Sequence, residues 1–304
     1  MRSTAFFHSF LEIPILPVSN PVLRRKHAME MKPLIDVLSI AMPILYALLV
    51  LAYGLVFFRD VEFASRLQRP LIVVILLVHG IYLGARTIAF QHPPITSVFE
   101  IMTLLAASIA AAYLYIEWRT TSRNTGFFIL SLAFAFQVVS SVGIHDMTTI
   151  PEYLHSMVLG FHVSAALLGY TAISLSAVYG FLYLMLYHEI KSTRFGLIYN
   201  RLPNLEMLEI MSHKSEVLGF ISLTVAITIG LIWLPRVFKD FSYFDPKLLG
   251  TFAIWVLYAI GLSAKRKFGW QGRKMMVLTL IAFGFVFLSM TVINLYLSRF
   301  HSFH

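Results

Sequence analysis

The chain has 304 residues, of which 58% are hydrophobic and 13% are charged, and its mean hydropathy is +0.77. Soluble globular domains carry about 25% charged residues, so this composition excludes a water-soluble enzyme, a DNA-binding domain and a disordered scaffold. The net charge of +9 therefore indicates basic loops beside a membrane rather than binding to nucleic acid.

Eight apolar runs follow one another along the chain, and each is close to the length of about 20 residues that spans a bilayer. In lipid, a helix satisfies its own backbone hydrogen bonds. We therefore predict an all-α integral membrane protein, a bundle of about eight transmembrane helices. The predicted spans are 34–58, 70–90, 95–118, 126–142, 157–187, 216–234, 248–263 and 275–297.

Lys and Arg are concentrated in the loops after the first, third, fifth and seventh predicted spans, most densely in 188–214 and 265–274. Cytoplasmic loops carry such an excess, so we place these loops in the cytoplasm and both termini on the outer, periplasmic side. Residues 1–30 break this pattern, because their basic residues would lie outside. We treat them as a leader of doubtful status, with Met29 or Met31 as the expected true start. Residues 31–304 are predicted to form a single polytopic membrane domain.

Two loops have patterns of their own. In residues 188–214, Leu205 and Leu208 alternate with acidic residues, which predicts an amphipathic helix on the cytoplasmic surface. Residues 236–247 form an aromatic outer loop in which several aromatic side chains lie among charges. Such a loop is either a membrane-interface belt or a flat platform for a ligand.

Histidine is the main remaining source of metal or cofactor ligands, because the chain contains no cysteine. His79 lies near the middle of the second span, where an ionisable side chain is costly unless it is paired or ligating. It is therefore a functional candidate, and a neutral imidazole that is hydrogen-bonded across helices is the alternative. Arg86, on the same helical face, either meets an anionic ligand or extends to the surface. Glu100 and Asp245 lie where spans begin, which favours helix capping.

His155 and His162 share a face at the outer end of the fifth span, and His301 lies just beyond the eighth span on the same side. Two outward histidines beside an aromatic loop are suited to be axial nitrogen ligands of haem iron, whereas each one alone reads as an interfacial side chain. The loop residues His92 and His145 are predicted to be solvated. The sequence lacks H-E-x-x-H, G-x-S-x-G, Walker and G-x-G-x-x-G motifs, so hydrolase, ATPase and nicotinamide chemistry have no support.

Several motifs between residues 71 and 304 together resemble those of one family. The loop 238–247 and the following 254–260 are similar to a tryptophan-rich "WWD" loop and the span after it. Phe161-His162-Val163-Ser164 is similar to M-H-V-S, and Phe300-His301-Ser302-Phe303 is similar to L-H-S-Y. Leu218–Thr224 is similar to I-G-F-P-L-L-T. These are motifs of the cytochrome c assembly family, which includes CcsA, ResC, HemX and YpjD, and the chain resembles that family with a degenerate WWD signature.

The resemblance implies a set of haem-binding residues. In the family, two outer histidines that flank the loop are axial ligands of haem presented for transfer, and intramembrane histidines hold haem on its way across. Position by position, the first role falls to His162 and His301, and the second falls to His79. The loop residues that would cover the porphyrin or order the loop are Phe241, Tyr243, Phe244 and Asp245.

Two functions follow from the resemblance. The first is a haem-handling protein of cytochrome c biogenesis in the bacterial inner membrane, which moves or presents non-covalent haem b to the outer side for attachment to apocytochrome c. It would work with a large CcsB- or ResB-like subunit and would not itself be an enzyme. The alternative is a HemX-like regulator or scaffold of haem biosynthesis. The predicted surface helix favours it, as does the loss of signature tryptophans at Phe238, Ser242, Phe244 and Gly250. A small-solute transporter has less support, because no inverted repeat is evident.

Overall fold

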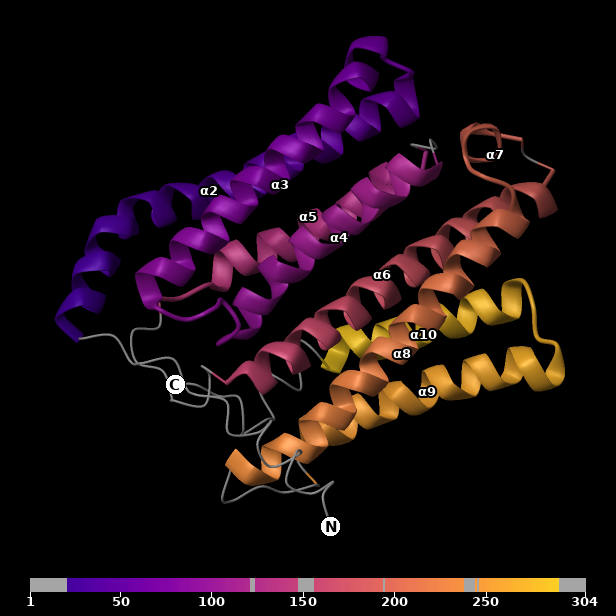
Figure 1. Cartoon of the computed structure of the whole chain (residues 1–304). Coiled ribbons are helices and arrows are strands. Elements are labelled where there is room, and N and C mark those ends of the chain that lie inside the picture. Colours follow the sequence, from indigo (N-terminus) through magenta and orange to yellow (C-terminus); the bar gives the residue numbers. More distant parts are fainter. Residues whose placement is uncertain are drawn as a thin grey trace.

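The computed structural model describes residues 21–120, 124–146, 156–193, 195–237, 244 and 246–289. Within these ranges every regular element is a helix, and the long helices lie side by side in one bundle (Figure 1). The helices are α2 (Pro21–Arg59), α3 (Glu62–Phe90), α4 (Val98–Thr120), α5 (Gly126–Gly143), α6 (Met157–Lys191), α7 (Leu197–Arg201), α8 (Leu205–Val237), α9 (Pro246–Phe268) and α10 (Arg273–Leu288).

Most of these helices fit the predicted spans. Among the described residues, seven helices, α2 to α6 with α8 and α9, are long and apolar enough to cross a membrane. The eighth predicted span is α10, which the structure describes over 16 residues. The predicted all-α membrane bundle is therefore confirmed, and the protein is a multi-pass membrane protein. The largest differences are at the beginnings of α2 and α8, which extend well before the predicted spans.

In residues 188–214 the amphipathic stretch is helical as predicted, but the prediction of a separate helix on the surface is wrong. The five-residue helix α7 occupies part of that segment, but the amphipathic stretch is the beginning of α8, which continues directly into the span. Leu208 is fully buried in the main core, and the Glu209 carboxylate accepts a hydrogen bond from the backbone N–H of Gly272 at 3.0 Å. An apolar stripe of helical period fits packing against protein as well as packing against lipid, so periodicity alone did not separate the two.

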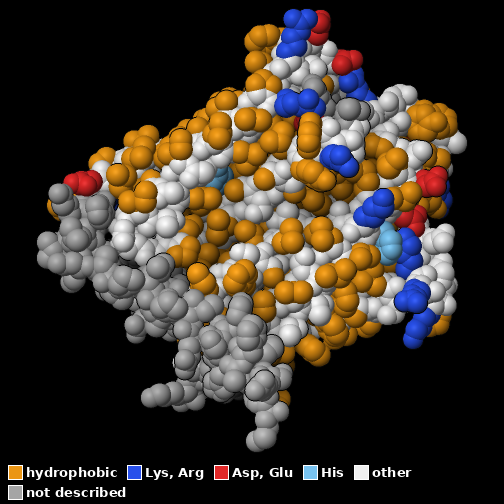
Figure 2. Space-filling model, in the orientation of Figure 1, with side chains coloured by type: hydrophobic (Ala, Val, Ile, Leu, Met, Phe, Trp, Pro, Cys, Tyr) orange, Lys and Arg blue, Asp and Glu red, His pale blue; other side chains and the backbone are white. Residues whose placement is uncertain are grey.

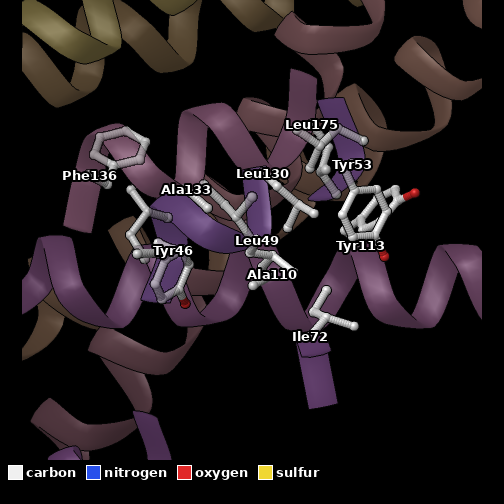
Figure 3. Close-up of a cluster of buried hydrophobic side chains, with 14 of the residues drawn as sticks. Tyr46, Leu49, Tyr53, Ile72, Ala110, Tyr113, Leu130, Ala133, Phe136 and Leu175 are labelled. Atoms are coloured by element: carbon white, nitrogen blue, oxygen red, sulfur yellow. The ribbon is translucent and has the colours of Figure 1, made fainter. Parts of the chain in front are cut away.

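Helix α6 lies between two groups of helices (Figure 1). Helices α2, α3, α4 and α5 pack together on one side, and α8, α9 and α10 lie on the other, while α6 contacts both groups. The larger core joins the first group to α6. Figure 3 shows Tyr46 and Leu49 of α2, Leu130 of α5 and Leu175 of α6 within it. A smaller core lies among α6, α8, α9 and α10 and contains Tyr258.

Helices α6 and α8 approach closely because glycines lie where they cross. A Cβ on Gly219 would lie 2.6 Å from Cγ1 of Ile173, and a Cβ on Gly169 would lie 2.8 Å from Cδ2 of Leu223. Small residues let transmembrane helices approach in this way, and the gain is close van der Waals packing. This α6–α8 seam brings the first half of α6, which carries His162, against α8.

Lys and Arg side chains gather at one end of the bundle, which we call the basic end (Figure 2). It consists of the last turns of α2, α4, α6 and α9 and the first turns of α3, α8 and α10. The beginning of α2 and the described end of α10 lie at the opposite end. The location of the basic end in the cytoplasm stays a prediction from the loop charges.

Candidate functional site

His79 lies in the interior of the first helix group. Its side chain is completely buried on α3, between α2 and α4. The Tyr46 hydroxyl of α2 lies 3.0 Å from Nδ1, and the Thr103 hydroxyl of α4 lies 3.0 Å from Nε2. Thr103 in turn donates its hydroxyl proton to Oε1 of Gln137 at 2.8 Å, and Nε2 of Gln137 donates to Ser141 at 3.1 Å. A hydrogen-bonded chain thus runs across four helices, from Tyr46 through His79 and Thr103 to Gln137 and Ser141.

The direction of these bonds fixes the tautomer of His79. Thr103 has one hydroxyl proton and gives it to Gln137, so the Thr103 oxygen accepts from Nε2–H of His79. Nδ1 is then the nitrogen with the lone pair, and it accepts a hydrogen bond from the Tyr46 hydroxyl. Because both ring nitrogens are engaged, iron ligation by His79 requires the opening of one of these bonds. The side chain is a neutral cross-helix imidazole in this structure, and its role toward haem stays a prediction.

Arg86 is buried at the end of the bundle opposite the basic end. Its Nη2 donates to Oε1 of Glu100 at 2.9 Å, and both side chains are 1% exposed. A second carboxylate, that of Asp146, lies 3.5 Å from Nη1, and the guanidinium lies 5.0 Å from the ring centroid of Phe90. Of the two alternatives for Arg86, extension to the surface is wrong, because the side chain is buried, and the anion that it meets is a carboxylate of the protein itself.

Glu100 also caps α4, as predicted. Its Oε2 accepts hydrogen bonds from the backbone N–H of Thr96 at 2.9 Å and from the Thr96 hydroxyl at 2.7 Å. The backbone N–H of Glu100 donates to the Ser97 hydroxyl at 3.2 Å, so the first turn of α4 has a reciprocal capping arrangement. The Arg86–Glu100 pair was missed from the sequence. The available signal was two opposite charges at the same depth, one where α3 ends and one where α4 begins.

His162 lies on the α6–α8 seam and is half-buried. Its Nδ1 lies 2.8 Å from the backbone oxygen of Ala226 on α8. A carbonyl oxygen is only an acceptor, so Nδ1 carries the proton and Nε2 holds the lone pair of the neutral ring. The ring approaches α8 closely where Gly230 lies, since a Cβ there would be 3.0 Å from Cε1 of His162. This is the arrangement of many metal-ligating histidines, in which a backbone carbonyl orients the ring and the other nitrogen faces the metal.

The two motifs that precede and follow the aromatic loop are in direct contact. Nε1 of Trp255 on α9 donates to the hydroxyl of Thr224 on α8 at 2.8 Å. The indole also stacks with Phe220, at a centroid distance of 5.3 Å, and with Phe252, at 5.7 Å. The sequence similarity of 218–224 and 254–260 to family motifs therefore marks a packed α8–α9 pair.

Several predicted site residues lie outside the described residues, namely His301, Phe241, Tyr243 and Asp245, and His155 also lies there. Phe244 is described and is 81% exposed. His145 is exposed as predicted, whereas the prediction for His92 is wrong, since it is buried.

The structure does not bring His79 and His162 into one site. The contacts of His79 are on α2 and α4, and the carbonyl partner of His162 is on α8. Among the described residues, no group of three or more His, Asp or Glu side chains is placed to hold a metal ion.

Comparison with known proteins agrees with this architecture. HemX of Bacillus subtilis (strain 168) is 26% identical over 223 residues, which cover 71% of this chain and 79% of that protein. The cytochrome c biogenesis protein CcsA of Trieres chinensis is 22% identical over 291 residues, which cover 86% and 93%. CcsA of Microcystis aeruginosa is 25% identical over 269 residues, which cover 73% and 82%. The profile of the family described as "Cytochrome C assembly protein" matches residues 37–301. The chain therefore belongs to the cytochrome c assembly protein family.

Proposed function

We propose that this protein handles haem during cytochrome c biogenesis and presents it at the outer side of the membrane for attachment to apocytochrome c. Family membership supports the general role, and so do the CcsA relatives, whose printed name is cytochrome c biogenesis protein. In this proposal the cargo is haem b, held without a covalent bond. The membrane is the bacterial inner membrane, and the partner is a large CcsB- or ResB-like subunit.

The observation that carries the proposal is the hydrogen bond from Nδ1–H of His162 to the carbonyl of Ala226. It fixes the ring orientation and leaves the lone pair on Nε2, which is the nitrogen that an iron ligand needs. The proposed second axial ligand is His301. In the same proposal Phe241, Tyr243 and Phe244 cover the porphyrin face, and Asp245 orders the loop.

The protein's own residues bind and orient the haem in this proposal. The iron and the vinyl groups are supplied by the haem, and the thiols by the apocytochrome, because this chain contains no cysteine. His162 holds one axial position through Nε2. The chain acts at most as a subunit of an attachment complex and not as an enzyme alone.

His79 has a separate proposed role, which is to hold haem on its way across the membrane. Its Nδ1 accepts from Tyr46 and its Nε2 donates to Thr103, so haem binding there requires a rearranged state. The closed hydrogen-bonded chain is the resting state of that position in this proposal.

The test is the absorption spectrum of the full-length protein, purified in detergent from haem-replete cells. We expect a Soret band of b-type haem that is lost or shifted in His162→Ala and in His301→Ala. His145→Ala is the matched control, since it removes an exposed histidine at the same end of the bundle and should leave the band unchanged. Haem-free wild-type protein, or a band that is indifferent to both substitutions, would contradict the proposal.

The regulator alternative makes the opposite prediction. It requires no resident haem at His162, and a cytoplasmic surface that contacts a haem-synthesis enzyme. One of its two supports is removed, because the predicted surface helix is part of α8. Its other support, the replacement of signature tryptophans, is unchanged. Haem-free protein with intact folding would therefore favour the regulator.

A further inference from the structure

A groove of about 260 Å³ lies between α6 and α10 at the basic end. It is separate from the contacts of His79 and His162, which involve α2, α4 and α8. The residues that line it are Leu184, Tyr187, His188 and Lys191 of α6 with Arg273 and Val277 of α10.

The lining has two tiers. Helix α6 runs toward the basic end, so Leu184 lies deeper in the bundle and Lys191 lies at its edge. Helix α10 runs the other way, so Arg273 lies at the edge and Val277 lies one turn deeper. Both helices therefore place a cation at the edge and an aliphatic side chain below it, as an amphipathic ligand with an anionic head requires.

Aromatic contacts hold the edge of the groove in place. The guanidinium of Arg273 lies 5.9 Å from the ring centroid of Tyr187, and that ring stacks on Tyr183 at 6.3 Å. Gly272, directly before Arg273, has φ 62°, and a Cβ there would lie 2.8 Å from the Tyr183 hydroxyl. The turn before α10 therefore depends on glycine, and it sets Arg273 beside α6.

The nearby carboxylates are directed elsewhere. Glu189 accepts a hydrogen bond from the backbone N–H of Tyr199 at 2.8 Å. Glu209 accepts from the backbone N–H of Gly272 at 3.0 Å and lies 3.8 Å from Nζ of Lys265. Within the described part of the chain, neither Lys191 nor Arg273 forms an ion pair with a carboxylate. The described lining of the groove thus contains two cations and the exposed imidazole of His188, and no carboxylate.

We propose that this groove binds an anionic phospholipid, with the phosphate between Lys191 and Arg273 and an acyl chain along Leu184 and Val277. Basic pockets between transmembrane helices are suited to anionic headgroups. The aliphatic tier favours a lipid over free phosphate, which has no apolar part. The apolar tier consists of two aliphatic side chains, Leu184 and Val277, and suits one acyl chain better than the broad flat ring of a porphyrin. The bound lipid would join α10 to α6 at the membrane surface.

The test is native mass spectrometry of the full-length protein in detergent, with added phosphatidylglycerol or phosphatidylcholine. We expect the wild type to retain phosphatidylglycerol preferentially. The variant Lys191→Gln/Arg273→Gln should retain it about 25-fold less well, since each cation near an anionic headgroup contributes roughly fivefold. The matched control is Arg266→Gln/Lys267→Gln, which removes two charges at the same end but outside the groove.

A second variant keeps the charges. Val277→Trp fills the apolar tier, and we expect weaker retention of phosphatidylglycerol with Lys191 and Arg273 intact. Three results would overturn the proposal: equal retention of both lipids, an equal loss in the control, or displacement of the lipid by inorganic phosphate or by haem. The Soret test at His162 is read from the response to His162→Ala and His301→Ala, and neither residue is in the described lining of this groove, so the two proposals fail separately.

Discussion

The two described histidines that were predicted to hold haem lie in contrasting surroundings. His79 belongs to a closed polar interior, in which Tyr46 and Thr103 engage both ring nitrogens. His162 lies on the α6–α8 seam, where the Ala226 carbonyl engages Nδ1 and the lone pair is on Nε2. Both rings are thus oriented by a neighbouring helix, and in the proposal for His162 the lone pair on Nε2 binds the iron. The hydrogen-bond partner of one ring nitrogen sets the tautomer, and the tautomer decides which nitrogen has the lone pair that a metal needs.

The largest expected effect is the loss of stability when the buried Arg86–Glu100 ion pair is broken. Glu100→Gln leaves the buried guanidinium of Arg86 without its nearest counter-charge, and we expect a loss of about 3 kcal/mol in the free energy of unfolding. Glu62→Gln is the control, because its ion pair with Arg66 is exposed and should cost no more than about 0.5 kcal/mol. Equilibrium unfolding in mixed micelles measures both. Similar losses in the two variants would show that the buried ion pair contributes no more to stability than the exposed one.

The two histidines themselves should respond in opposite ways. His79→Leu leaves the buried Tyr46 hydroxyl without its partner, so we expect a loss of about 2 kcal/mol in unfolding free energy. His162→Leu removes the hydrogen bond to the Ala226 carbonyl on a half-buried seam and should cost less than about 1 kcal/mol. For bound haem the order should reverse, with the larger loss in His162→Leu. Equal losses of stability and of bound haem in the two variants would contradict different roles for His79 and His162.

A smaller effect is expected when the hydrogen bond between His79 and Thr103 is removed. Thr103→Val removes the acceptor of Nε2–H and should cost about 1 kcal/mol of stability. It also allows His79 to move its proton to Nδ1, so that Nε2 has a lone pair for iron. In a His162→Ala background, we expect Thr103→Val to raise the haem retained after purification. No gain in haem, with the protein still folded, would mean that Thr103 does not control that position.

The smallest effect concerns the packing of His162. In Gly230→Ala the new Cβ lies 3.0 Å from Cε1 of His162, so the ring must shift by a few tenths of an ångström. We expect haem affinity to fall about threefold, equivalent to roughly 0.6 kcal/mol, with little change in stability. Gly284→Ala on α10 is the matched control, because a Cβ there meets nothing within 4 Å. Haem titration by absorption compares the two variants. Equal haem affinities would show that Gly230 does not control the position of the His162 ring.

The sequence predicted the helices well and their polar contacts poorly. Long apolar runs and the charge of the loops are local signals. The spans therefore followed from them, and so did the gathering of the basic loops at one end of the bundle. The contacts of His79 depend on Tyr46, Thr103 and Gln137, which come from three other helices. The sequence pattern of a single span does not predict such contacts. The surface helix failed for a related reason. The apolar face that begins α8 at Leu205 packs on the protein, which periodicity does not distinguish from packing on lipid.

In the candidate site, too, individual residues were predicted from the sequence, whereas their contacts were not. His162 was predicted from its family motif, but its hydrogen bond to Ala226 required the α6–α8 seam, which in turn depends on Gly169 and Gly219. The capping role of Glu100 was predicted from its position at the beginning of a span. Its pairing with Arg86 needed the geometry, because the two residues are on different helices.

The central claim is that His162 ligates haem iron through Nε2, and chemical rescue tests it most directly. Electron paramagnetic resonance of the oxidised, haem-loaded protein should give a low-spin signal in the wild type and a high-spin signal in His162→Gly. Added imidazole should restore the low-spin signal in His162→Gly, because it supplies the missing nitrogen in the space that the ring occupied. A low-spin signal that persists in His162→Gly without imidazole would contradict the claim.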